Sequence, residues 1–357
     1  MLAIRSDLYR VAMTQTQVFL KHFFNDITQT LNPYKTVPNT PQNRNKEPSC
    51  WIITEGMAGT QNQCIGVAQA LGLDNAEIKK IELMQPWKTL SPYLKLEQSW
   101  SFSPSLEPPW PDLVLSSGRK SIATARYIKR QSEGKTIIAQ IQDPRVNPEQ
   151  FDLVAVPAHD PTRGPNVVVT TAAPNKITTE RIEKERESFP QLENLKAPRV
   201  AVLIGGTSKA YCMSKNITRK LADQLSEIEA SLMITCSRRT GEGNQKTLRK
   251  KLDKKGNFFW DGNGQNPYLA MLGWADIILV TADSVSMLSE SCTTGKPVYM
   301  IPLEGGAPRI NKLHHNLINR GALRIFEGTF ETWGYEPLND AQMVAKEIKT
   351  RFSLFNE

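Results

Sequence analysis

Two series of short apolar runs, each leading through a turn into a helical pattern, constrain the fold more than any other feature of this sequence. The first series includes runs at Cys50–Thr54, Asp112–Gly118 and Lys135–Gln142, and the second includes Arg199–Ile204 and Asp276–Val280. Strands that alternate with helices form parallel sheets, because each helix carries the chain back to the edge at which the next strand starts. The sequence therefore predicts an α/β fold with two Rossmann-like, doubly wound domains.

The same pattern sets the expected domain boundaries. Further expected strands are Phe151–Val156, Val167–Thr170, Ser231–Thr235, Asn257–Trp260 and Pro297–Ile301. The first domain is expected at residues 50–172 and the second at 199–335, with a charged helical linker at 173–198. A final helix within residues 336–357 is expected to return to the first domain. Because ligands of open α/β sheets bind at the carboxyl ends of the strands, we expect a cleft there, between the two domains.

The first 49 residues differ from the rest, since they carry three acidic residues against six Lys or Arg residues and end in a segment rich in Pro and Asn. An amphipathic helix is expected over Tyr9–Phe24. The apolar residues never form the continuous stretch of a secretory signal. Two interpretations stay open, a loosely attached helical arm and an organellar presequence.

Composition disfavours several classes of protein. No stretch of the sequence approaches the roughly 18 apolar residues that a membrane-spanning helix needs. The five cysteines stand singly, without the paired spacing of a zinc site, so we expect no metal, no cofactor and a reducing, cytoplasmic compartment. The GxGxxG fingerprint is absent after the expected strands, which disfavours a nicotinamide-dependent dehydrogenase.

The excess of 44 Lys and Arg residues over 36 Asp and Glu residues, a formal net charge of +8, favours anionic partners. The densest basic run is Lys246–Lys255. It is interpreted as a solvated helix face or as a peripheral contact with a membrane surface. Nucleic-acid binding is disfavoured, because the run lacks interleaved aromatic residues.

The turn after Ile204 is a candidate phosphate site. Gly205, Gly206, Thr207 and Ser208 follow a strand and precede a helix, so backbone amides and two hydroxyls could donate to a diphosphate. The alternative is an ordinary strand-to-helix turn, since glycine is common at such junctions. Further candidates for contact with donor phosphate are Lys312 and His314.

A second candidate site follows the strand at Asp276–Val280. A polar loop with Asp283 and Ser284 precedes a helix that carries Ser286 and Glu290. Helix-start amides and hydroxyls would bind phosphate, and the Glu290 carboxylate could accept both hydroxyls of a ribose. The alternative is that Glu290 is a solvated helix residue. This segment resembles the donor-binding half of GT-B glycosyltransferases, including the N-acetylglucosaminyltransferase of lipid II synthesis.

Six strings between Trp51 and Gly328 resemble a narrower family. They are Glu55–Gln63, Ser116–Arg119, Gln142–Arg145, Ala158–Asp160, Ile204–Thr207 and Thr281–Glu290. These strings resemble the mitochondrial fission ELM (elongated mitochondria) family, whose plant members are linked to mitochondrial division. The resemblance implies a GT-B-like fold and, for a eukaryotic chain, a place at the mitochondrial surface.

Transfer of a sugar from a nucleotide donor needs a base for the acceptor and cationic or amide groups for the departing diphosphate. His159 follows the expected strand Phe151–Val156 and is therefore the candidate base, with Asp143 as a second candidate. The alternatives are that His159 orders its own loop through Asp160 and that Asp143 caps Arg145.

Other turns of the first domain supply candidate residues on the acceptor side of the cleft. Arg119 and Arg145 follow strand ends, where a guanidinium group could bind an anionic acceptor or a diphosphate, although surface arginines are the plain alternative. The remaining candidates on this side are Gly56, Gly59, Gln61, Asn62 and Gly118. The lipid II enzyme would have a histidine in the first glycine turn, where this sequence reads Gly-Thr-Gln-Asn.

Two functions stay open. The first is a glycosyltransferase that uses a nucleotide sugar, with UDP as the expected nucleotide, and an envelope saccharide or lipid-linked acceptor. The second is a non-catalytic scaffold that acts through protein and membrane contacts, as the fission role of plant relatives implies. Glu290 and the two candidate phosphate loops favour the first function, and the missing histidine favours the second.

Overall fold

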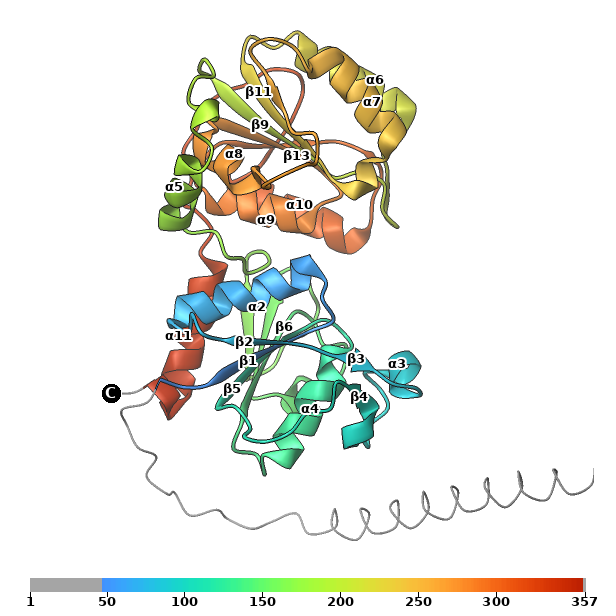
Figure 1. Cartoon of the computed structure of the whole chain (residues 1–357), viewed down its shortest axis with the longest axis vertical. Helices are drawn as coiled ribbons and strands as arrows, with labels where there is room; N and C mark the ends of the chain where they lie inside the picture. Colours follow the sequence, from blue (N-terminus) through green and yellow to red (C-terminus); the bar gives the residue numbers. More distant parts are fainter. Residues whose placement is uncertain (1–46, 356–357) are drawn as a thin grey trace, which may run out of the picture. The chain divides into compact units, whose positions relative to one another are not determined.

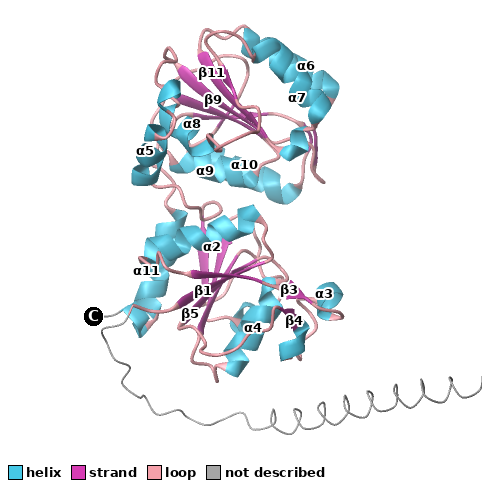
Figure 2. Cartoon of the chain, viewed as in Figure 1, coloured by secondary structure: helices cyan, strands magenta, loops and turns pink. Residues whose placement is uncertain are grey.

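Figure 1 shows the structure, a computed structural model in which residues 47–355 are described. The amphipathic helix, the arm and the presequence considered for the N-terminal extension fall on residues 1–46 and lie outside the described residues. Within residues 47–355, two six-stranded parallel sheets are flanked by helices (Figure 2).

The first sheet has the strand order β2-β1-β5-β6-β7-β8, and every neighbouring pair is parallel. Its strands are β1 (Cys50–Thr54), β2 (Glu77–Lys80), β5 (Leu113–Ser117), β6 (Ile137–Ile141), β7 (Leu153–Pro157) and β8 (Val167–Thr170), with helices α2 (Ala58–Leu71) and α4 (Ser121–Gln131). Five of these strands are predicted from the sequence. The edge strand β2 is not, because three of its four residues are charged.

The second sheet has the order β12-β11-β9-β13-β14-β16 and is also parallel throughout. Its strands are β9 (Arg199–Ile204), β11 (Ser231–Cys236), β12 (Phe258–Phe259), β13 (Ile277–Thr281), β14 (Val298–Ile301) and β16 (Arg324–Ile325). The helices of this part are α5 (Thr179–Glu187), α6 (Lys215–Ser226), α7 (Glu242–Leu252), α8 (Tyr268–Trp274), α9 (Val285–Thr293) and α10 (Pro308–Asn319). We call each sheet with its helices a half of the protein.

Both faces of each sheet are buried, which explains the near-continuous runs of Val, Ile and Leu. Side chains alternate between the two faces along a strand. In β1, Ile52 packs in a cluster with residues of α2, whereas Ile53 packs in a cluster with residues of α4. In β9, Val202 packs with residues of α6 and Leu203 with residues of α8. The predicted α/β class with two Rossmann-like, doubly wound sheets is therefore confirmed.

The last helix of the chain, α11 (Asp340–Arg351), packs against α2 of the first half. Its Ile348 side chain is fully buried in the core of the first sheet. The Asp340 carboxylate accepts hydrogen bonds from the amides of Thr171 at 2.8 Å and Ala172 at 3.0 Å. The end of the chain is thus a structural part of the first half.

Two short antiparallel pairs accompany the sheets. In the first half, β3 (Glu82–Leu83) pairs with β4 (Phe102–Ser103), and α3 (Trp87–Leu90) lies between them in the chain. In the second half, β10 (Tyr211–Cys212) pairs with β15 (Glu304–Gly305). None of these elements is predicted from the sequence, because two residues of a strand or four of a helix are too few to show a periodic pattern.

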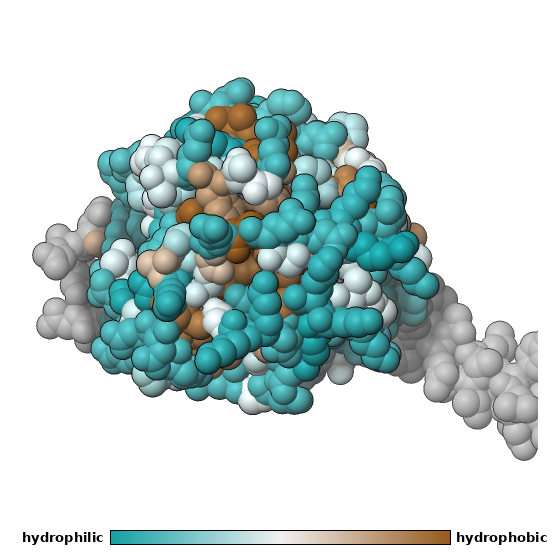
Figure 3. All heavy atoms as spheres, turned by 90° about the horizontal axis from the view of Figure 1, so that it is seen from above, coloured by the Kyte–Doolittle hydropathy of each residue, from teal (hydrophilic) through white to brown (hydrophobic). Residues whose placement is uncertain are grey.

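The face of the molecule in Figure 3 is mainly hydrophilic, with smaller hydrophobic areas among the polar side chains. No helix within residues 47–355 has the length and apolar character needed to cross a bilayer. All five cysteines are free thiols. In the same range, no group of three or more His, Cys, Asp or Glu residues is placed to hold a metal ion.

Candidate functional site

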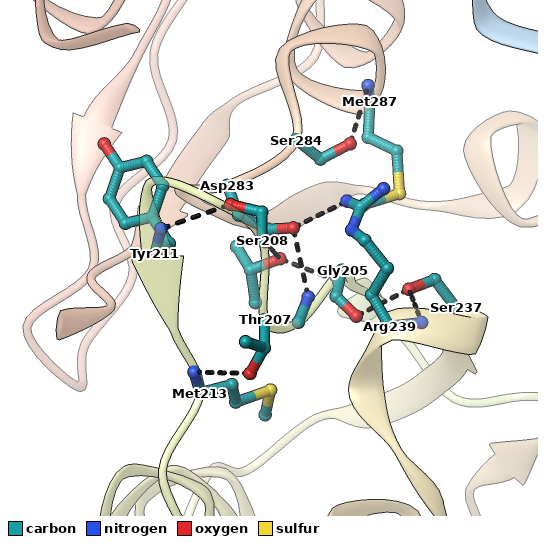
Figure 4. A network of polar contacts seen from close by, with 12 residues as sticks. Gly205, Thr207, Ser208, Tyr211, Met213, Ser237, Arg239, Asp283, Ser284 and Met287 are labelled. Atoms are coloured by element: carbon teal, nitrogen blue, oxygen red, sulfur yellow. Dashed lines mark hydrogen bonds and ion pairs between the residues drawn. The ribbon is translucent and has the colours of Figure 1, made fainter. Parts of the chain in front are cut away.

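The Asp283 carboxylate is the centre of a hydrogen-bond network that joins the two loops predicted as phosphate sites (Figure 4). Its Oδ1 accepts from Thr281 Oγ1 at 2.7 Å, and its Oδ2 accepts from the amide of Gly206 at 3.1 Å. The amide of Gly205 donates to Thr281 Oγ1 at 2.7 Å. Because β9 and β13 are neighbours in the second sheet, their carboxyl ends bring these loops together in one site.

Close approach explains why both positions of the turn are glycine. A Cβ at Gly205 would lie 2.3 Å from Asp283 Oδ1. Gly206 has a φ of +139°, and a Cβ there would lie 2.2 Å from the carbonyl oxygen of Arg239. The turn thus accommodates an internal carboxylate, and its first two amides already donate to side chains of the protein. A diphosphate at these amides would have to replace Asp283 and Thr281 as the acceptors.

Arg239 is a residue of this network that the sequence did not reveal. Its guanidinium donates to Asp283 Oδ2 at 2.6 Å and is about half exposed, whereas the Asp283 side chain is fully buried. The hydroxyls of Ser237 and Thr240 each donate to the carbonyl of Gly205 at 2.6 Å. The signal that could have identified these residues is their position directly after β11, the strand beside β9. The exposed N–H groups of Arg239 remain available to an anionic ligand.

The hydroxyls predicted as extra donors accept hydrogen bonds from the backbone. Thr207 Oγ1 accepts from the amide of Met213 at 3.2 Å, and Ser208 Oγ accepts from the amide of Tyr211 at 3.1 Å. Ser284 caps α9 by accepting from a backbone amide in its first turn at 3.4 Å. A hydroxyl that accepts through its oxygen keeps its own proton as a donor. These three groups can therefore still donate to a ligand.

Glu290 is buried in α9, so the alternative of a solvated helix residue is wrong. Its Oε2 accepts a hydrogen bond from the hydroxyl of Tyr268 at 2.5 Å. Burial raises the pKa of the Glu290 carboxyl, and the hydrogen bond from Tyr268 and the positive charges of Lys176 and Arg181 act in the opposite direction. Glu290 is thus held by residues of α8 and of the linker rather than by solvent.

A small cavity separates Glu290 from the first half. Its volume is about 10 Å³, close to the minimum for one water molecule. It is lined by Gly59, Asn62, Gln63, Ala173, Pro174, Asn175, Ser286, Ser289 and Glu290. Two predicted groups of residues, one on α2 and one on α9, therefore meet here, but a ribose does not fit between them in this arrangement.

His159 follows β7 and is buried beside Asp160. Its Nε2 lies 3.6 Å from Asp160 Oδ1, and its Nδ1 has no hydrogen-bond partner within the described chain. The Asp160 carboxylate also forms an ion pair with Arg309 of α10, which joins this loop to the second half. Burial lowers the pKa of His159, the charges of Arg309 and Lys312 lower it further, and Asp160 opposes them. The lowered pKa favours the neutral form of the imidazole, which is the form that a general base needs.

Helix α10 connects His159 with the network around Asp283. Burial lowers the pKa of His314, and a hydrogen bond with the backbone of Ala282 opposes the shift. The rings of His314 and Tyr211 lie 6.3 Å apart, and the hydroxyl of Tyr211 donates to Asn311 Oδ1 at 3.1 Å. His314 and Lys312, two further candidates from the sequence, thus lie on the helix that contacts the loop of His159.

Asp143 accepts hydrogen bonds from the amide of Arg145 at 2.9 Å and from the hydroxyl of Thr162 at 2.7 Å. This contact is the capping role weighed as the alternative for Asp143. The side chains of Arg145 and Arg119 are exposed and have no hydrogen-bond or ion-pair partner within residues 47–355. Their guanidinium groups are therefore free to meet an anionic ligand.

The first glycine turn borders a larger cavity. Gly56 (φ +84°) lies against Lys80, and Gly118 (φ +90°) lies near Glu55. Glu55 accepts from Lys120 Nζ at 2.9 Å. The cavity has a volume of about 300 Å³ and is lined by Glu55, Lys80, Ile81, Glu82, Leu83, Lys88, Ser103 and Lys120. Gln61 and Asn62 lie in the first turns of α2 and are partly buried. Of the predicted acceptor-side residues, Gly59 and Asn62 line the small cavity beside Glu290, and none lines this larger cavity.

Comparison with known proteins supports the resemblance seen in the sequence. A profile of the family described as Mitochondrial fission ELM1 matches residues 58–352. Mitochondrial fission protein ELM1 of Arabidopsis thaliana is 28% identical in an alignment 382 residues long, gaps included, that covers 84% of this chain and 90% of the plant protein. Uncharacterized protein RP120 of Rickettsia prowazekii is 25% identical in an alignment 359 residues long, gaps included, that covers 84% of this chain and 97% of that protein.

Among solved structures, MurG of Acinetobacter baumannii shares 16% sequence identity with a TM-score of 0.45, covering 85% of this chain and 95% of that one. The family profile spans most of the two halves described above. On that match, the chain belongs to the mitochondrial fission ELM1 family.

Proposed function

We propose that this member of the ELM1 family is a glycosyltransferase that uses a nucleotide sugar, with UDP as the nucleotide, and a lipid-linked or saccharide acceptor. The proposal depends above all on His159, a buried and neutral imidazole at the carboxyl end of β7. Arg309 and Lys312 reach the same place from the second half. A neutral base beside cations suits transfer of a sugar from a diphosphate.

In the proposed reaction, the acceptor hydroxyl gives its proton to His159 while its oxygen forms a bond to the anomeric carbon of the donor sugar. The bond between that carbon and the diphosphate oxygen breaks, and its electron pair leaves with the nucleoside diphosphate. Arg309 and Lys312 stabilise the charge that develops on the leaving group. Because Nε2 faces Asp160, Nδ1 is the atom that takes the proton. Asp143 is the second candidate base.

The donor nucleotide is assigned to the second half. The exposed N–H groups of Arg239 and the free protons of the Thr207 and Ser208 hydroxyls are donors for a diphosphate. The Glu290 carboxylate is the acceptor for ribose hydroxyls, which requires the cavity of about 10 Å³ beside it to widen when the nucleotide binds. On the other side of the site, Arg119 and Arg145 supply positive charge for an anionic acceptor.

A scaffold without catalytic activity is the second candidate function, and occupation of the donor site by the protein's own groups favours it. Asp283 and Thr281 accept hydrogen bonds from the amides of the glycine turn, and Tyr268 donates a hydrogen bond to an oxygen of Glu290. The cavity beside Glu290 measures only about 10 Å³. A scaffold needs no open nucleotide site, and it would act through protein and membrane contacts.

Isothermal titration calorimetry against a panel of nucleotides and nucleotide sugars separates the two functions. The glycosyltransferase is expected to bind one class of nucleotide saturably. It is also expected to release the nucleoside diphosphate from the preferred donor when a membrane extract supplies acceptors. A folded protein that binds no member of the panel and releases no diphosphate would be a scaffold.

Replacement of Glu290 by alanine is expected to weaken nucleotide binding by about 1–3 kcal/mol, the range for a hydrogen bond to a charged group. The affinity is measured by the same calorimetry, and thermal unfolding checks that the variant is folded. Glu229→Ala, at an exposed site in the same half, is the matched control and should bind like the wild type. If Glu290→Ala folds and keeps its affinity, Glu290 does not belong to the nucleotide site.

A further inference from the structure

One segment of the first half carries a concentration of exposed apolar side chains. Within residues 47–355, ten large hydrophobic side chains are exposed, and five of them fall in the segment between β3 and β4. These five are Met84, Leu90, Tyr93, Leu96 and Trp100. We call residues 84–100, which include α3 in Figure 1, the apolar loop. Such a concentration marks an interaction surface rather than the usual scatter of single apolar residues.

Buried polar contacts hold the apolar loop in place. The guanidinium of Arg126 on α4 donates to the carbonyl of Pro92 at 2.7 Å and to that of Leu94 at 2.8 Å. It also forms an ion pair with the buried carboxylate of Glu97. The hydroxyl of Ser91 donates to the carbonyl of Arg119 at 3.2 Å. The loop is therefore an ordered structure in which Trp87 and Leu94 pack into the core and the five exposed apolar side chains stay outside it.

Leu96 has an unusual backbone conformation for a residue with a side chain. Its φ is +72°, in the left-handed region that side chains other than glycine adopt at an energetic cost. Its side chain is nevertheless 57% exposed and so gains little from burial. Leu90 and Tyr93 are 48% and 68% exposed. Strain at an exposed leucine indicates that its position serves a contact made outside the chain.

The charges of the apolar loop identify the kind of partner. Its one acidic residue, Glu97, is buried and neutralised by Arg126 and Arg130. Its basic residues, Lys88 and Lys95, are exposed, and only Lys88 has an acidic partner within the described residues. Aromatic and aliphatic side chains with flanking lysines match the boundary between lipid headgroups and acyl chains, where lysines meet anionic phosphates.

We propose that the apolar loop inserts into the surface of a bilayer that contains anionic lipid. Leu90, Tyr93 and Leu96 enter the acyl boundary, and Lys95 lies at the headgroups. The cavity of about 300 Å³ at the carboxyl edge of the first sheet shares Lys88 with the loop, so this attachment brings the cavity close to the membrane. The contact depends on no step of the proposed reaction and would serve a scaffold equally well.

Sedimentation of the full chain with vesicles tests the proposal. The wild type is expected to partition more strongly onto vesicles of phosphatidylcholine mixed with phosphatidylglycerol than onto phosphatidylcholine alone, and salt should weaken the difference. Leu96→Gly is expected to lower the partition coefficient about tenfold, because it removes one inserting side chain. Since glycine adopts a positive φ freely, the variant should unfold at the same temperature as the wild type or higher.

Two sets of variants complete the test. Ile325→Ser alters a side chain that is 47% exposed in the second half, and it should sediment like the wild type. The double variant Lys246→Glu, Lys250→Glu changes the basic run on α7 and should also keep most of the binding. Any of three results would overturn the proposal: the wild type shows no preference for anionic vesicles, Leu96→Gly has the same partition coefficient as the wild type, or only the α7 variant loses binding. Because the measurement needs no turnover, its failure would leave the proposed reaction untouched.

Discussion

Replacement of His159 by alanine is expected to lower turnover by about 10²–10⁴-fold while donor binding stays nearly intact, the signature of a lost general base. The reason is that His159 is the neutral imidazole next to the cations of α10. Release of nucleoside diphosphate from the preferred donor measures turnover, and calorimetry measures binding. His315→Ala is the matched control, since that imidazole is exposed on the same helix. A fully active His159→Ala variant would direct attention to Asp143.

The dependence of the reaction on pH gives a second measurement on the same variant. Burial holds the pKa of His159 below its ordinary value of 6.5. A base acts in its neutral form, so kcat/KM of the wild type should stay level at neutral pH and fall only when the pH drops below 6.5. The residual activity of His159→Ala should lack this fall. If the variant retains it, another group is responsible.

Replacement of Gly205 by alanine is expected to destabilise the folded protein by about 3 kcal/mol, because overpacking adds to the loss of contacts around a buried charge. The added Cβ would lie 2.3 Å from Asp283 Oδ1. To escape the clash, Asp283 would have to leave the hydroxyl of Thr281, the amide of Gly206 and the guanidinium of Arg239. Denaturation by urea measures the change in the free energy of unfolding.

Gly243→Ala is the control for this substitution. Gly243 lies in α7, and a Cβ there would meet no atom within 4 Å. Alanine favours the helix over glycine, so the control should stabilise the protein by about 0.5–1 kcal/mol. If Gly205→Ala unfolds at the same urea concentration as the wild type, the Asp283 network does not hold the two loops together.

The two sheets could be predicted because strands that are buried on both faces appear in the sequence as continuous apolar runs. The bounds of β1 and β8 are those expected, Cys50–Thr54 and Val167–Thr170. The edge strand β2 could not be found in this way, since its exposed, charged residues show no apolar run. The apolar loop was not predicted either, because the presence of Leu and Trp in a sequence does not tell whether they are buried.

The candidate site was predictable in its loops but not in its contacts. The carboxyl ends of parallel strands meet at one edge, so the sequence could place Gly205 and Asp283 near each other. It could not show that the Asp283 carboxylate turns toward the glycine turn, since this hydrogen bond spans 77 residues. The ion pair between Asp160 and Arg309 spans 149 residues and depends on how the two halves pack. Such long-range pairs leave no local pattern.

The position of α11 determines when the first half can complete its folding during synthesis. Residues 50–170 leave the ribosome before α11 does, so at that stage their core lacks Ile348, and the amides of Thr171 and Ala172 lack the Asp340 carboxylate. The whole of the second half is translated before these groups exist. During synthesis, the nascent first half therefore exposes the surface of α2 that α11 later covers. Its core is completed only when α11 has been translated, after the sheet that follows the first half in the chain has had time to fold.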